Sequence, residues 1–92
     1  MNKEKFIAQI LSGHTCEYIY ENESNETTGM IKVWLHDSNI ILTHEECPKG
    51  SQYDESLYIK DEVHKFSSFE ELGDFFDKKS IVYNKFKSYF GF

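Results

Sequence analysis

The sequence predicts an α+β domain in which helices cover one face of an antiparallel sheet. Apolar residues recur at helical spacing near both ends, apolar and polar residues alternate through the middle, and turn-forming residues separate the alternating stretches. These three observations predict an N-terminal helix, an antiparallel sheet of three to four strands, and two C-terminal helices packed on one face. A chain of 92 residues is expected to form a single domain over residues 1–92.

Residues 3–11 are predicted to form the first helix. Phe6 and Ile10 lie four residues apart within one apolar stripe, and Gly13 follows where a glycine commonly ends a helix. Apolar and polar residues then alternate over residues 14–20, which indicates a half-buried strand.

A β-hairpin is predicted from two alternating stretches, 30–36 and 39–45, because the turn-forming residues between them favour a tight reversal. A loop rich in polar and turn-forming residues follows over 46–56. Residues 57–66 are predicted to form a fourth strand, and a bend or break near Asp61 is left open.

Two helices are predicted after this strand. Ser67 with Glu70, or Ser68 with Glu71, has the three-residue spacing of a capping box. A helix is therefore expected to begin there and to run through residues 69–78. A last helix is predicted over residues 81–90, from a stripe of apolar and aromatic side chains at helical spacing.

The charge distribution narrows the class of partner. The formal net charge is −6, and all ten basic residues are lysine. Fifteen acidic residues stand against four lysines between Glu17 and Asp77, whereas the segment from Lys78 onward holds four lysines and no acid. An acidic body without arginine is poorly suited to gripping phosphates, so direct binding of nucleic acid is not expected.

The hydropathy pattern predicts a cytoplasmic location. No stretch approaches the run of about eighteen apolar residues that a membrane span needs, and the first dozen residues lack the apolar run of a signal peptide. No membrane association is therefore expected. In a reducing compartment the two cysteines are expected to be thiols.

Two short stretches each carry a histidine and a cysteine, which raises the question of a metal site. The four candidates, of the types and number that zinc prefers, are His14, Cys16, His44 and Cys47. Two residues apart on a strand, His14 and Cys16 would be separated by about 7 Å, which is loose for chelation. In a meander a further strand would separate the two pairs. We therefore favour buried thiols and no metal or other cofactor, with a zinc-stabilised module and a Cys16–Cys47 disulfide as alternatives.

No reaction centre is recognisable in the sequence. A small thiol enzyme, the further alternative, would need a cysteine of depressed pKa, and His44 could serve Cys47 as base, but no third residue can be named to orient it. Adjacent carboxylates such as Glu45 and Glu46 point apart on a strand, which does not favour acid–base chemistry. No phosphate-binding glycine loop or nucleophile motif is present. The chain is not expected to be an enzyme, and no catalytic residue is assigned.

Carboxylates are the most informative side chains. On the helix expected after Ser67, three of them fall at i, i+4 and i+7 with no lysine interposed, although like charges at this spacing repel. Together with acids from the second half of the sheet region they are expected to form one broad negative surface that binds a partner. Its members are Glu45, Glu46, Asp54, Glu55, Asp61, Glu62, Glu70, Asp74 and Asp77. The alternative is a solvated face that only keeps a small protein in solution.

Several aromatic residues are candidates for contact with a partner. Trp34 and Tyr58 are expected opposite the aliphatic residues of their strands, and Tyr89 and Phe92 belong to a tail richer in aromatics than one buried stripe requires. A homodimer through these side chains is left open.

The function expected from these features is inhibition by stoichiometric binding. A small acidic chain without a catalytic constellation is of the same type as bacterial immunity proteins and as phage proteins that block host nucleases or CRISPR effectors. This is an analogy of size, charge and class. The expected partner is a basic protein, in particular an enzyme that acts on nucleic acid, because complementary charge steers association.

Overall fold

The computed structural model describes residues 1–51 and 53–90 of the chain. Along the sequence, the helices, strands and short 3-10 turns (η) are α1 (Lys3–Leu11), β1 (His14–Asn22), β2 (Thr27–His36), β3 (Asn39–Pro48), η1 (Glu55–Leu57), β4 (Lys60–Phe66), α2 (Phe69–Lys79), η2 (Tyr83–Lys85) and β5 (Lys87–Phe90). The predicted class, α+β with an antiparallel sheet, is confirmed, and the N-terminal helix lies where the sequence predicts it.

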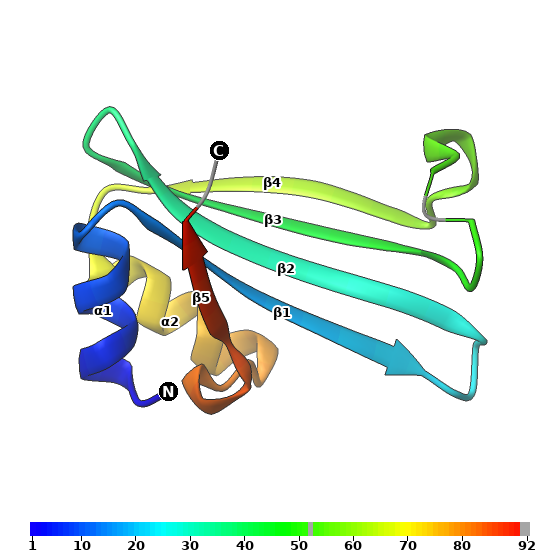
Figure 1. Ribbon diagram of the computed structural model, residues 1–92, viewed down its shortest axis with the longest axis horizontal. Helices are drawn as coiled ribbons and strands as arrows, with labels where there is room; N and C mark the ends of the chain where they lie inside the picture. Colours follow the sequence, from blue (N-terminus) through cyan, green and yellow to red (C-terminus); the bar gives the residue numbers. More distant parts are fainter. Residues whose placement is uncertain (52, 91–92) are drawn as a thin grey trace.

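The sheet has five antiparallel strands, and not the three to four predicted, in the order β4-β3-β2-β1-β5. The first four strands form a meander, and β5 returns beside β1 after α2. Both helices gather near one end of the sheet, on one side of it, and the long strands β1 to β3 extend past them (Figure 1). We call the end beyond the helices, where β1 ends and β2 begins, the distal end.

The two helices begin at capped residues. The Asn2 side chain accepts a hydrogen bond of 2.8 Å from the backbone N–H of Lys5, which starts α1. The Ser68 side chain accepts one of 3.2 Å from Glu71 N–H at the start of α2, so Ser68, and not the alternative Ser67, is the capping residue. Each helix thereby satisfies one of the backbone donors that its first turn leaves free.

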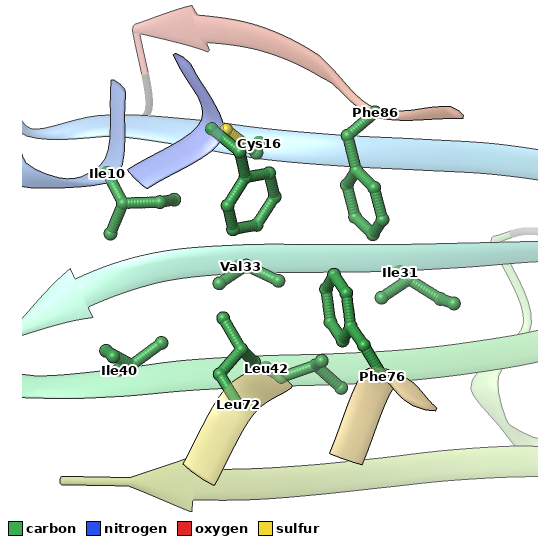
Figure 2. Close-up of a cluster of buried hydrophobic side chains, with 10 residues drawn as sticks. Ile10, Cys16, Ile31, Val33, Ile40, Leu42, Leu72, Phe76 and Phe86 are labelled. Carbon is green, nitrogen blue, oxygen red and sulfur yellow. The ribbon is translucent and has the colours of Figure 1, made fainter. Parts of the chain in front are cut away.

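The hydrophobic core lies between the helices and the sheet face that they cover (Figure 2). Alternate residues of the strands point into it, as period-two geometry requires, and meet apolar side chains from α1, α2 and the segment before β5. Its buried members are Phe6, Ile10, Cys16, Ile31, Val33, Ile40, Leu42, Leu72, Phe76 and Phe86.

The prediction of two C-terminal helices is wrong, because only α2 forms. Ser80 adopts a left-handed conformation at φ 58°, and Ile81 N–H donates to the Phe76 carbonyl at 2.8 Å, which ends the helix. The chain then runs through η2 into β5, which pairs with the start of β1. Phe86 and Phe90 are an even number of residues apart and can share one side of a strand, and the unpaired backbone of β1 gives the strand its partner.

The fourth strand is shorter than predicted. β4 begins at Lys60, so Leu57 and Tyr58 precede it. Asp61 and Glu62 pair in unbroken register with Glu45 and His44, and the strand has no break there. Within the described part of the chain, no helix is long and apolar enough to cross a membrane.

Candidate functional site

One face of the sheet carries no helix and exposes apolar side chains. Strand residues that alternate with the core residues point to this side, where Ile19 is 57% exposed and Val63 is 68% exposed. We call this side the open face; its apolar members are Ile19, Met30, Trp34, Ile41 and Val63. The uncovered face of an antiparallel sheet is commonly polar, so this apolar group is a candidate binding surface.

The strand register sets the apolar residues of the open face beside charged ones. In one row across the sheet, Ile19 pairs with Met30, which pairs with Glu45, which pairs with Asp61. In another row, Trp34 pairs with Ile41, which pairs with Lys65. Aromatic, aliphatic and charged groups therefore lie within one surface, as they do in protein interfaces.

Glu45 and Asp61 are direct cross-strand neighbours of like charge. Such pairs destabilise a sheet, and neither carboxylate forms an ion pair with any described residue. A cationic group from another molecule would relieve the repulsion between them.

A hollow of about 340 Å³ lies at the distal end of the open face. The segment between β3 and β4 forms one side of it with Tyr53 and Tyr58, and the sheet forms the other side with Ile19, Met30 and Glu45. Tyr53 is fully exposed. The hollow extends the apolar surface and brings two aromatic rings to it.

The predicted acidic residues do not form one surface. Because successive residues of a strand point to opposite sides, Glu45 and Asp61 lie on the open face, whereas Glu46 and Glu62 lie on the side of the helices. Asp54 lies in the segment before η1, and Glu55 lies in η1. The expected single negative surface is therefore divided among both faces of the sheet, this segment and α2.

The three carboxylates of α2 lie on its exposed side, opposite the buried Leu72 and Phe76. Glu70, Asp74 and Asp77 form no ion pair with the described residues. Asp74 also lines a hollow of about 300 Å³ with Phe66 and Phe75, so the apolar contact area beside these carboxylates is limited to two partly buried rings.

The four candidate zinc ligands are not brought together. β1 carries His14 and Cys16 and is separated by β2 from β3, which carries His44 and Cys47. On β3, His44 and Cys47 also point to opposite faces. Across residues 1–51 and 53–90, no group of three or more His, Cys, Asp and Glu side chains is placed to hold a metal ion.

Both cysteines are buried free thiols. Burial raises the pKa of the Cys16 thiol to about 11, which makes it a poor nucleophile at neutral pH. The Cys47 thiol lies 3.9 Å from the Thr28 carbonyl, to which it donates a weak hydrogen bond. The two side chains lie on opposite faces of the sheet, so the alternative of a disulfide between them does not fit this fold.

A polar cluster that sequence reasoning missed lies on the helix side of the sheet. The Tyr20 hydroxyl is 2.7 Å from His44 Nε2 and donates to Glu46 Oε1 at 2.8 Å, and the Thr27 hydroxyl donates to Glu46 Oε2 at 3.0 Å. We call Tyr20, Thr27, His44 and Glu46 the polar cluster. Three strands contribute to it, so no local motif could reveal it; the only sequence signal is the two-residue spacing of His44 and Glu46.

The hydrogen bonds of the polar cluster fix the tautomer of His44. The single proton of the Tyr20 hydroxyl goes to the Glu46 carboxylate, so His44 Nε2 must carry the proton of its own bond to Tyr20. The Nδ1 atom of the neutral ring is then an acceptor. Burial is the main cause that lowers the pKa of His44 and raises the pKa of Tyr20, so both side chains are neutral at pH 7.

The candidate aromatic contacts occupy different places. Trp34 lies on the open face, and Tyr58 precedes β4 at the distal hollow. Tyr89 is in β5, a strand and not the predicted helix. Phe92 lies outside the described residues.

Comparison with protein-family models, with curated proteins and with solved structures finds no match to this chain.

Proposed function

We propose that this chain binds a basic protein through the open face and acts by occupying that partner's surface. The observation that carries the proposal is the open face itself, where a tryptophan and four aliphatic side chains lie beside two unpaired carboxylates, Glu45 and Asp61. Specific interfaces combine an apolar centre with a charged rim, and this surface has both parts.

The charge of the chain supports a basic partner. A net charge of −6 accelerates encounter with a cationic protein. A cation between the carboxylates of Glu45 and Asp61 would also remove the repulsion between them. Proteins that act on nucleic acid carry the basic surfaces that match this description. We therefore propose an inhibitor of such an enzyme, of the immunity-protein or anti-CRISPR type, as the specific form of this function.

The proposal is tested by affinity capture from the native host with two matched sets of charge reversals. One set, Glu45→Lys with Asp61→Lys, changes the open face, and the other, Glu70→Lys with Asp74→Lys, changes the exposed side of α2. We expect the first set and a separate Trp34→Ala variant to abolish capture of the partner, and the second set to weaken it modestly through the loss of long-range attraction.

The measurement is the amount of captured partner at low and at high salt, with the fold of each variant checked by circular dichroism. Capture by the wild type is expected to fall steeply as salt rises, because exposed charges are screened. If the α2 variant loses capture while the open-face variants retain it, the proposed docking surface is wrong.

A further inference from the structure

A recess on the helix side of the sheet lies apart from the open face. It has a volume of about 310 Å³ and opens where α2 ends above the sheet. Its sheet side is formed by Tyr18, Tyr20, Ile31 and His44, and Lys79 and Lys85 lie on its other side with residues 80–82. This volume is at the lower end of the range for small-molecule sites.

The aromatic side of the recess is held in place by packing. The Tyr20 ring lies against Gly29 on the neighbouring strand so closely that a Cβ at that position would overlap the ring. The hydroxyl of Tyr20 is fixed at its other end by His44 and Glu46. The Tyr18 ring lies 5.4 Å from the Tyr20 ring and 5.7 Å from the Phe86 ring, between centroids. The recess therefore offers a preformed aromatic surface.

The end of α2 supplies the cationic side of the recess. Lys79 is the last residue of the helix, and the left-handed Ser80 turns the chain so that η2 brings Lys85 to the same recess. Lys79 Nζ lies 6.0 Å from the centre of the Phe75 ring. Neither lysine forms an ion pair with the side chains that the structure describes.

Two acids near the recess already have hydrogen-bonding partners. The Glu46 carboxylate accepts hydrogen bonds from Tyr20 and Thr27, and the Glu62 carboxylate lies 3.0 Å from His64 Nε2. Glu17, which lines a neighbouring hollow with Lys85, points to the opposite face of β1 from Tyr18. Among the residues that line the recess itself, Lys79 and Lys85 are the charged ones, because the His44 ring is neutral. This asymmetry favours an anionic ligand.

We propose that the recess binds a small aromatic anion, a single ring that carries a carboxylate or a phosphate. The ring packs against Tyr18, Tyr20 and Ile31, where offset or edge contacts between aromatic groups are favourable. The anionic group lies toward Lys79 and Lys85, which gain the charged partner that they lack. This site lies on the opposite side of the sheet from the open face, so it does not depend on the proposed docking of a protein.

The test is a titration of the full chain with three probes, followed by two-dimensional NMR of the backbone amides. The probes are benzoate, phenyl phosphate and the neutral benzyl alcohol, each added to about 10 mM, which exceeds the millimolar dissociation constant expected of so small a ligand. We expect at least one anion to shift the resonances of Tyr20, His44 and Ile81 in a saturable manner. Comparison of the two anions then assigns the carboxylate or the phosphate as the preferred group.

Two matched variants separate the recess from general attraction of anions. In the double variant Lys79→Gln with Lys85→Gln, we expect the dissociation constant of the preferred anion to rise by about tenfold or more, because two charge-assisted contacts are lost. In Lys32→Gln with Lys65→Gln, which removes the same charge from the open face, we expect no change beyond about twofold. Both pairs are surface substitutions, and their amide spectra report that the fold is retained.

Three results would each overturn the proposal. They are the absence of saturable shifts at the recess with both anions, equal binding of benzyl alcohol, and equal weakening by the two pairs of lysine substitutions.

Discussion

Gly29 and Tyr20 illustrate how one small residue shapes the helix side of the sheet. They are cross-strand partners, and the Tyr20 ring covers the space that a side chain at position 29 would occupy. Glycine within a strand usually weakens it, so its presence here is explained by the ring that it admits. The same ring presents the hydroxyl that joins His44 to Glu46.

Gly29→Ala is expected to lower the free energy of unfolding by about 1–3 kcal/mol, because the new methyl group must displace the Tyr20 ring. Urea denaturation measures the change. The control is the same substitution in a Tyr20→Ala background, where the space is empty and alanine is expected to be tolerated. Equal losses in both backgrounds would show that the two residues are not coupled.

At the scale of elements, helices and strands are predicted correctly where the apolar residues follow a single period, either helical or alternating. The hairpin of β2 and β3 follows from alternation, and the start of α2 at one of two adjacent serines, Ser67 or Ser68, follows from the capping spacing. The segment after Ser80 is ambiguous, since its aromatic residues favour a helical stripe while Phe86 and Phe90 are also spaced to share one side of a strand. The exposed edge of β1 decides between them, and that edge is a tertiary feature which no local pattern contains.

The strand assignment of β5 predicts unequal effects of proline at adjacent positions. An edge strand directs only alternate backbone N–H groups toward its neighbour, so only one of two adjacent residues donates a hydrogen bond to β1. In a helix the N–H groups of both residues would be bonded. Lys87→Pro and Ser88→Pro are therefore expected to lower the free energy of unfolding by clearly different amounts. Urea denaturation gives the two free energies, and amide exchange reports loss of the β1–β5 pairing. Equal disruption by both prolines would favour the helix and contradict the strand.

At the scale of the whole molecule, the sheet divides the acidic residues that the sequence presents as doublets. Each doublet places its first carboxylate, Glu45 or Asp61, on the open face. Its second carboxylate, Glu46 or Glu62, lies on the helix side. The composition predicts that the protein is acidic, but the register decides that one carboxylate pair lies on the open face while Glu46 joins a hydrogen-bonded cluster. The candidate binding residues could thus be named from the sequence, whereas their separation required the strand order and register.

Because of the excess of negative charge, added salt is expected to change the stability of the fold and the binding of a basic partner in opposite directions. Among the residues that the structure describes, most carboxylates form no ion pair. Lys49, which lies 3.7 Å from both Glu21 and Glu23, is the one lysine there that forms ion pairs. Screening of the remaining repulsion is expected to raise the free energy of unfolding by about 1 kcal/mol between low salt and about 0.3 M sodium chloride.

The same increase in salt is expected to weaken capture of a basic partner, so one solution variable separates the two effects of charge. Urea denaturation at each salt concentration measures the stability. The matched variant is Glu70→Gln with Asp74→Asn and Asp77→Asn, which removes three like charges from one helical stripe and leaves the core unchanged. In this variant the gain of stability with salt is expected to shrink, because less repulsion remains to be screened. A fall in stability with salt in the wild type would mean that favourable ion pairs, and not repulsion, dominate its surface.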